Sequence, residues 1–208
     1  MFLSQVEVAN PWQVMDNRLK DLTHLGAYHN WVEMSFPEAV KQGERPRHLW
    51  RIDEHRGRRF LLIASQEKPN LERLNYYGVP GSARAKSYDN WLNNLQSGQR
   101  YRFRLTANPT KRLSENHKRV ALTQPEECVK WLQCQGEKYG FLLQGVQITC
   151  HDTPLLRRKG SQPTRLNRIV FDGQLTVTDP PKLRLAMTEG IGREKAYGMG
   201  MITLMRIR

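Results

Sequence analysis

The sequence predicts an α+β protein of two tandem ferredoxin-like domains, each with the RRM-like βαββαβ order. Both halves of the 208-residue chain open on an alternating strand pattern, over residues 2–9 and 100–105. In both halves a helical pattern follows, and further strand patterns come after it. The length suits two domains of roughly 100 residues each. We therefore expect an N-terminal domain at residues 1–95 and a C-terminal domain at residues 96–208.

The N-terminal half predicts a strand, a helix and a hairpin, in that order. Val6 and Val8 alternate with polar side chains, which is typical of a half-buried strand. The helix carries apolar side chains at helical spacing, and Pro37 limits it. No clear pattern covers residues 85–95. The expected elements are a strand at 2–9, a helix at 22–35, strands at 47–54 and 60–64, a short helix at 70–75 and a loop at 76–84.

The C-terminal half repeats the order with clearer signals. Tyr101, Phe103 and Leu105 alternate with three arginines, so one face of this strand is expected to meet a core. Asp179 before two prolines is a helix N-cap signal. Asp172-Gly173 is either a bulge or a two-residue turn. The expected elements are strands at 100–105, 141–150, 165–178 and 199–207, and helices that begin at Pro125, with Val129 and Leu132 inward, and at Pro180.

Positive charge is concentrated in the second half of the chain. There are 33 Lys and Arg against 20 Asp and Glu, a net charge of +13. Residues 1–95 hold 13 basic and 11 acidic side chains (+2), and residues 96–208 hold 20 and 9 (+11). Such an excess attracts polyanions, because each neutralised phosphate releases counterions. Nucleic acid is the expected partner, and no basic amphipathic helix points to a membrane surface.

The remaining composition favours a cytoplasmic protein. Hydrophobic residues make up 38% of the chain, enough for a core. No apolar run approaches the roughly 20 residues that span a bilayer, and the N-terminus shows no export signal. The three cysteines, an odd count, suit a reducing compartment better than a disulfide framework.

The sharpest local motif is the glycine-rich segment GIGREKAYGMG at residues 190–200. Its glycines allow positive φ angles and close approach to a partner, and Arg193 and Lys195 add charge where backbone N–H groups can meet phosphate. A Rossmann loop would open a helix, whereas this segment follows one. From the segment alone, an ordinary glycine-rich connection is an equal alternative. The glycines are Gly190, Gly192, Gly198 and Gly200.

The chain resembles the type I-E CRISPR-associated endoribonucleases, the Cascade subunits that process precursor CRISPR RNA. Members of that superfamily have two tandem ferredoxin-like domains and a glycine-rich loop before the last strand. The resemblance covers the whole chain and is strongest from residue 99. The matching segments are YRFRLTANPTK at 101–111, KRVAL at 118–122, VKWL at 129–132, FDGQL at 171–175 and the glycine-rich segment.

The residues favour RNA cleavage without a metal ion. The adjacent acidic pairs, at residues 53–54 and 126–127, have no spacing that suggests a shared ion, and the cysteines do not fit zinc spacing. We expect no metal and no other cofactor. The remaining route is attack by the RNA's own 2′-hydroxyl, which leaves a 2′,3′-cyclic phosphate and a 5′-hydroxyl. A histidine to transfer protons and cations to stabilise the transition state would serve this reaction.

The resemblance implies that His29 is the catalytic histidine. In the family this residue lies on the first helix, a few residues before a Phe-Pro-like end, and His29 precedes Phe36-Pro37 by seven positions. The residues alone favour a core histidine on an inward face, with Leu25 and Val32, over a catalytic one, and His24 is a backup candidate that the family resemblance does not support. Relatives often have a tyrosine three residues before the histidine, where this chain has Gly26. Tyr28 is the remaining tyrosine candidate, and its role stays open.

The RNA grip is expected from the basic second half. The resemblance implies that residues 151–160 enter the major groove of the repeat stem-loop, where arginine engages guanine edges or phosphates. A solvated surface loop is the alternative for this segment. The expected RNA-binding residues are Arg102, Arg104, Lys111, Arg112, Arg157, Arg158, Lys159, Arg165, Arg168, Gly190, Gly192, Arg193, Lys195, Gly198 and Gly200.

Three functional classes follow. The first is an endoribonuclease that cuts the CRISPR RNA repeat stem-loop and stays on the mature guide RNA, next to the backbone subunit and the other Cascade subunits. The second is a catalytically silent RRM-like subunit that only caps the guide RNA hairpin. The third is an unrelated tandem RRM-like RNA-binding protein.

Overall fold

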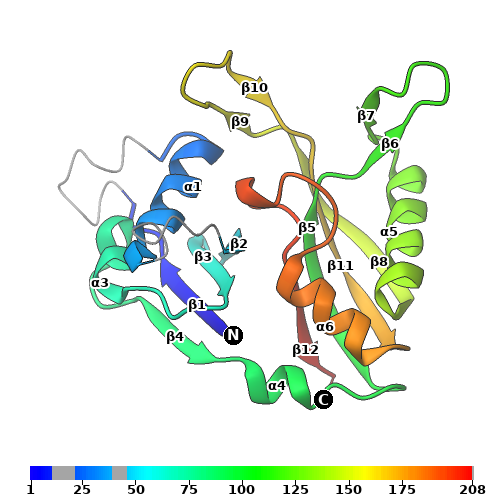
Figure 1. Cartoon of the computed structure of the whole chain (residues 1–208), viewed down its shortest axis with the longest axis horizontal. Helices are drawn as coiled ribbons and strands as arrows, with labels where there is room; N and C mark the ends of the chain where they lie inside the picture. The colour runs from blue at the N-terminus through cyan, green and yellow to red at the C-terminus, as the bar shows by residue number, and fades with distance from the viewer. Residues whose placement is uncertain (11–21, 39–45, 208) are drawn as a thin grey trace. The chain divides into compact units, whose positions relative to one another are not determined.

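The computed structural model describes residues 1–10, 22–38 and 46–207 (Figure 1). The chain forms two compact units. Unit 1 comprises Met1–Trp91, Leu155–Thr164 and Ala196–Gly198, and unit 2 comprises Leu92–Pro154, Arg165–Lys195 and Met199–Arg208. Each unit contains a four-stranded antiparallel sheet, which confirms the predicted tandem ferredoxin-like fold. Among the described residues, no helix combines the length and the apolar character needed to cross a membrane.

In unit 1 the sheet has the order β2-β3-β1-β4. The first and third strands lie in the middle, and every neighbouring pair is antiparallel. This is the strand order of a ferredoxin-like sheet. The elements are β1 (Phe2–Glu7), α1 (Leu25–Met34), β2 (Leu49–His55), β3 (Arg58–Ser65), α3 (Leu71–Leu74), η2 (Asn75–Tyr77), β4 (Arg84–Ser87) and α4 (Asp89–Asn93).

Helix α1 has a capped start and one buried face. The His24 side chain caps its start by accepting a hydrogen bond from the Ala27 backbone N–H at 3.2 Å. Tyr28, Trp31 and Val32 are buried and share one face of the helix. The Trp31 indole N–H donates to the Leu74 carbonyl at 3.1 Å. One face of α1 is therefore fixed in the core of unit 1.

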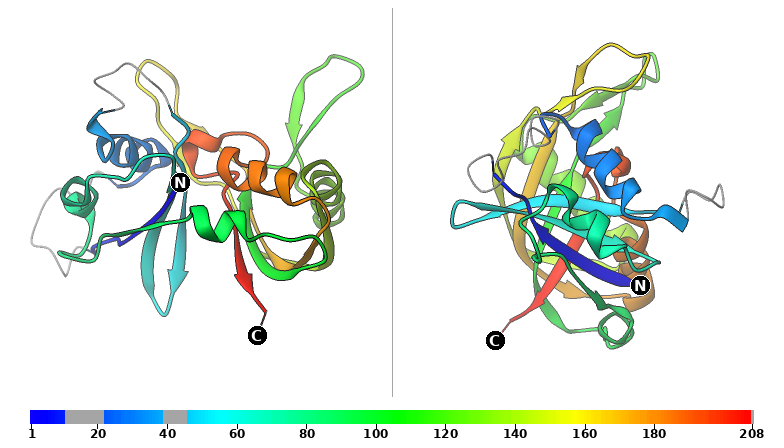
Figure 2. Two further views of the ribbon diagram at one scale, coloured as in Figure 1. Left: turned by 60° about the horizontal axis from the view of Figure 1, so that its bottom comes forward. Right: turned by 90° about the vertical axis from the view of Figure 1, so that its left-hand side faces the viewer.

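The sheet of unit 2 repeats this arrangement with the order β12-β5-β11-β8. Helices α5 and α6 cover one of its faces (Figures 1 and 2). The elements are β5 (Arg100–Ala107), β6 (Thr110–Arg112), β7 (Arg119–Ala121), α5 (Pro125–Tyr139), β8 (Phe141–Asp152), β9 (Leu155–Leu156), β10 (Thr164–Arg165), β11 (Arg168–Val177), α6 (Pro180–Glu189), η3 (Lys195–Tyr197) and β12 (Ile202–Arg206).

Both helices of unit 2 begin at the predicted residues, Pro125 and Pro180. Gly140 closes α5 in the left-handed conformation, with φ 72°. The Asp179 side chain caps α6 by accepting from the Lys182 N–H at 3.1 Å. Within α5 the inward positions are Cys128 and Leu132, whereas the predicted Val129 is only half-buried. Neighbouring residues of a helix lie about 100° apart, so the buried stripe is shifted by one position.

Three features differ from the sequence expectations or were absent from them. Residues 85–95 contain most of β4 and all of α4, and β4 begins within the expected loop, at Arg84. Strands β6 and β7 form a separate hairpin that extends from the sheet of unit 2 (Figure 2). Asp172-Gly173 lies inside the continuous strand β11, and a register shift follows at Gln174/Leu175. The predicted strand is therefore continuous at this point, and the alternative of a two-residue turn is wrong.

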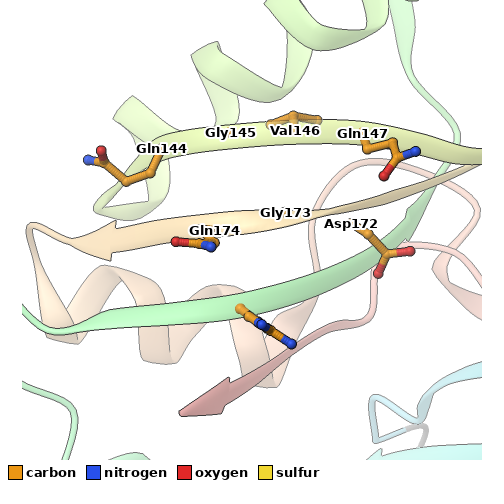
Figure 3. A pocket seen from close by; sticks show the side chains of 8 residues that line it. Gln144, Gly145, Val146, Gln147, Asp172, Gly173 and Gln174 are labelled. Atoms are coloured by element: carbon orange, nitrogen blue, oxygen red, sulfur yellow. The ribbon is translucent and has the colours of Figure 1, made fainter. Parts of the chain in front are cut away.

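The middle of β11 depends on a glycine. Gly173 lies beside Gly145 of β8 in a shallow hollow on the open face of the sheet (Figure 3). A Cβ atom at Gly173 would overlap the Gly145 carbonyl oxygen and lie 3.0 Å from the Phe103 ring. The backbones of β8 and β11 can approach this closely because Gly173 has no side chain.

We predict that Gly173→Ala lowers the free energy of unfolding by about 1–3 kcal/mol, because backbone must shift to admit the methyl group. Urea or thermal unfolding measures the loss. Gly145→Ala is the matched control, since nothing lies within 4 Å of the Cβ position there. Equal stability of the two variants would contradict the packing described for β11.

Candidate active site

His29 lies on the half-exposed side of α1, in unit 1. Its side chain is 29% exposed, whereas its neighbours Tyr28 and Trp31 are buried. The Nδ1 atom is buried and makes no hydrogen bond of standard geometry with the described residues. The Glu33 carboxylate, one turn later, has Oε1 3.7 Å from this Nδ1. His29 is therefore accessible to a substrate along part of its ring.

Burial is the main influence on the proton affinity of His29. It holds the pKa of the imidazole below its ordinary value of 6.5. The Glu33 carboxylate opposes this effect and raises the pKa, His48 lowers it, and the Ala196 backbone raises it. A pKa below the ordinary value leaves most of the imidazole neutral at pH 7, so His29 can accept a proton there.

The ring of Tyr197 contacts both His29 and Arg158. The His29 and Tyr197 ring centroids are 5.4 Å apart in an edge-on arrangement. The Arg158 guanidinium lies over the same tyrosine ring, 4.7 Å from its centroid. Strand β2 fixes the backbone next to Tyr197, because the indole N–H of its Trp50 donates to the Ala196 carbonyl at 3.0 Å. An imidazole and a guanidinium therefore contact the same aromatic ring.

The chain between β9 and β10 packs closely on the start of α1. A Cβ atom at Gly26 would overlap the Arg157 carbonyl oxygen. Position 26 therefore has no room for a larger side chain while Arg157 keeps its place. His24, Asn30 and Arg157 help to line a surface hollow here. Position 26, where the family resemblance implied a tyrosine, is thus used for backbone contact.

The other two candidates on α1 have structural contacts. Tyr28 is 7% exposed, its ring stacks on Trp50 with 6.0 Å between centroids, and its hydroxyl accepts from Arg59 at 3.3 Å. His24 is the N-cap residue, and burial, followed by the positive charge of Arg157, lowers the pKa of its imidazole. Among these residues His29 is the one that Tyr197 and Glu33 both approach.

The predicted RNA-binding residues fall into three groups by their contacts. Arg157, Arg158 and Lys159 are exposed on the unit 1 segment between β9 and β10. Arg102, Arg112 and Arg193 are exposed in unit 2. Five predicted residues of unit 2 have protein partners: Arg104 with Asp172 at 2.7 Å, Lys111 with Glu127 at 2.6 Å, Arg168 with Asp152 at 2.8 Å, Arg165 with the Thr153 carbonyl at 2.9 Å, and the exposed Arg112 with the His117 carbonyl at 3.4 Å.

The glycine-rich segment has backbone conformations that favour glycine. All four glycines have positive φ, between 76° and 85°. A Cβ atom at Gly198 would lie 2.7 Å from the Trp50 ring, and one at Gly200 would lie 2.7 Å from the Ile191 carbonyl oxygen. These two glycines are buried against protein. Lys195, at the start of η3, is half-buried.

Comparison with known proteins identifies the family of the chain. The family model described as CRISPR associated protein matches residues 1–206. The chain belongs to this family. The CRISPR-associated endoribonuclease Cse3 of Thermus thermophilus is 35% identical over 199 residues, which cover 89% of this chain and 92% of that protein.

Solved structures of family members extend the similarity to the fold. Thermus thermophilus Cse3 bound to an RNA representing a pre-cleavage complex has a TM-score of 0.81 and 29% identity, with 98% of each chain covered. A chain of a CRISPR RNA-guided surveillance complex has a TM-score of 0.70 and 25% identity, with both chains covered fully. The sequence resemblance to this family is confirmed.

Sequence reasoning missed three residues around His29 in this family member. Glu33 has an accessible signal, since it follows His29 by four positions on a predicted helix. His48 and Tyr197 lie far away in the sequence, and no local pattern links either residue to His29. Among the described residues, no three His, Cys, Asp or Glu side chains gather as a metal-binding group.

Proposed function

We propose that the chain is a metal-independent endoribonuclease that cuts precursor CRISPR RNA at the repeat stem-loop. In this proposal it stays bound to the mature guide RNA as a subunit of Cascade, beside the backbone subunit. Family membership and the similarity to the endoribonuclease Cse3 support the activity. The observation that carries the proposal is the ring of Tyr197, which adjoins His29 on one side and Arg158 on another.

The proposed reaction is an internal transesterification. His29 accepts the proton of a 2′-hydroxyl, whose oxygen forms a bond to the adjacent phosphorus. The bond from phosphorus to the 5′-oxygen breaks, and this oxygen takes a proton from solvent. The products are a 2′,3′-cyclic phosphate and a 5′-hydroxyl. Arg158, whose guanidinium lies over the Tyr197 ring, is proposed to stabilise the negative charge that develops on the phosphate oxygens.

The grip on the RNA is proposed to come from the exposed cations. The segment with Arg157, Arg158 and Lys159 would enter the groove of the stem, and Arg102, Arg112 and Arg193 would contact backbone. Arginines that already pair with carboxylates, such as Arg104, would need to exchange partners. The N-terminal domain, residues 1–95, carries the proton-transfer group, and the C-terminal domain, residues 96–208, supplies most of the net charge.

The silent capping subunit is not favoured. A protein that only held the hairpin would gain nothing from a half-exposed histidine whose pKa burial lowers. Family membership also removes the unrelated RNA-binding protein from consideration. Tyr28, with its hydroxyl bound to Arg59, is proposed to support the helix that carries His29.

We predict that His29→Ala lowers the rate of hairpin cleavage by about 10² to 10⁴, the usual contribution of a positioned proton-transfer group. Single-turnover assays on a repeat hairpin in EDTA measure the rate and test metal independence together. His55→Ala, at an exposed histidine of the β2–β3 hairpin, is the matched control. Wild-type rates in the His29 variant would mean that the histidine is structural.

We predict that replacing Arg157 and Arg158 with alanine weakens binding of the repeat hairpin by about 1–3 kcal/mol for each arginine that contacts a base. A scrambled hairpin should lose less. The control replaces Arg56 and Lys130, also exposed, and removes the same charge. Equal losses on both hairpins would show that the segment contacts phosphates only.

We predict single-turnover behaviour on the repeat hairpin. The stem remains attached to the upstream product after the cut, so the contacts that hold it are not lost. A burst of product equal to the enzyme present should precede a slow phase, and added salt should speed that phase because phosphate contacts weaken with ionic strength. Rapid multiple turnover at moderate salt would exclude a subunit that retains its product.

A further inference from the structure

His29 and His48 share one carboxylate oxygen. Oε1 of Glu33 lies 3.7 Å from the Nδ1 of His29 and 3.1 Å from the Nδ1 of His48. Glu33 and His29 are on α1, and His48 directly precedes β2. All three belong to unit 1. The proposed reaction uses His29 and gives no role to Glu33 or His48.

His48 is the fixed member of the group. Its side chain is 1% exposed, and its ring stacks on Phe36 with 3.9 Å between centroids and an interplanar angle of 12°. An ionised carboxylate only accepts hydrogen bonds, so the His48 Nδ1–H donates to Glu33. The His48 Nε2 is buried and has no hydrogen-bond partner among the described residues. The single polar contact of this ring therefore holds Glu33.

Glu33 in turn faces the inner nitrogen of His29. A carboxylate beside Nδ1 favours the tautomer with the proton on that nitrogen, which leaves Nε2 as the base. It also stabilises the positive charge that the imidazole gains when Nε2 accepts a proton. In the Ser-His-Asp hydrolases a carboxylate hydrogen-bonded to the same nitrogen orients the histidine; in this protein the 3.7 Å separation makes the contact electrostatic. The contacts around His29 bring Glu33, His48 and Tyr197 to it, with Arg158 over the Tyr197 ring.

We infer that Glu33 is a positioning residue for His29, and that His48 holds Glu33 in the required place. The inference rests on the proposed function, because it assigns to Glu33 a part in the same proton transfer. The proton moves from the 2′-hydroxyl to Nε2 of His29, and Glu33 takes up no proton in this step. Glu33 does not touch the RNA and acts only through the imidazole.

Glu33→Gln tests the inference, because glutamine keeps the size of the side chain and removes its charge. Without the carboxylate the protonated imidazole is less stable, so the pKa of His29 falls further. The rising limb of the pH–rate profile should therefore move to lower pH, and the plateau rate should fall about 10- to 100-fold because the base is weaker. Hairpin affinity should not weaken.

Three variants separate a positioning role from a structural one. Glu54→Gln, on the exposed part of β2, is the matched control and should keep the wild-type profile. Glu33→Asp keeps the charge but withdraws it by one methylene group, and its rate should lie between those of Glu33→Gln and the wild type. His48→Gln should also lower the plateau rate, because Glu33 loses its partner.

The titration of His29 in the free protein gives a readout that needs no RNA. Its ring protons, assigned by comparison with His29→Ala, should titrate at lower pH in Glu33→Gln than in the wild type. An unchanged midpoint, or a wild-type cleavage rate in Glu33→Gln, would overturn the inference. A wild-type protein that binds the hairpin without cutting it would instead contradict the proposed function.

Discussion

The indole of Trp50 holds the Ala196–Gly198 segment in unit 1 through two contacts. Its N–H donates to the Ala196 carbonyl at 3.0 Å, and its ring occupies the space that a side chain at Gly198 would need. Tyr28 stacks on the same indole. One hydrogen bond to its backbone and one close packing contact therefore fix this segment. Its Tyr197 ring then meets the His29 ring in an edge-on arrangement. Glycine at position 198 allows both the positive φ angle and the close approach of the Trp50 ring.

Opposing electrostatic effects set the chemistry of His29. Burial disfavours the charged imidazole, whereas the Glu33 carboxylate favours it, and the net result is a lowered pKa. A base must be neutral before the reaction and must tolerate charge after it. Partial burial satisfies the first requirement, and a carboxylate fixed by His48 satisfies the second. The buried ring of His48 has no hydrogen-bond partner at Nε2 among the described residues, and leaving such a polar atom unpaired costs about 1–3 kcal/mol.

The basic residues divide into those that hold the protein together and those that remain exposed to a polyanion. Arg104 and Arg168 each make a two-pronged contact with an aspartate across neighbouring strands of unit 2. Arg157 and Arg158 are exposed on the segment that packs beside α1. The net charge of +13 therefore overstates the charge that RNA can meet directly. The position of each arginine decides which role it has.

The sequence by itself determined the secondary structure that follows local rules. The alternation of Tyr101, Phe103 and Leu105, the Asp179 cap and Gly140 at the end of α5 each act within a few residues, so the ferredoxin-like order was predictable. Resemblance to the family added His29.

Packing against distant residues decided two other features: the shift of the buried stripe in α5 from Val129 to Cys128, and the strand β4. Such packing also formed the group around His29: Glu33 is one helical turn away and was open to prediction, but His48 and Tyr197 are 19 and 168 positions further along the chain. Only tertiary contacts bring them together, because the Phe36 ring and the Trp50 indole, and not any local pattern, fix where those two side chains lie.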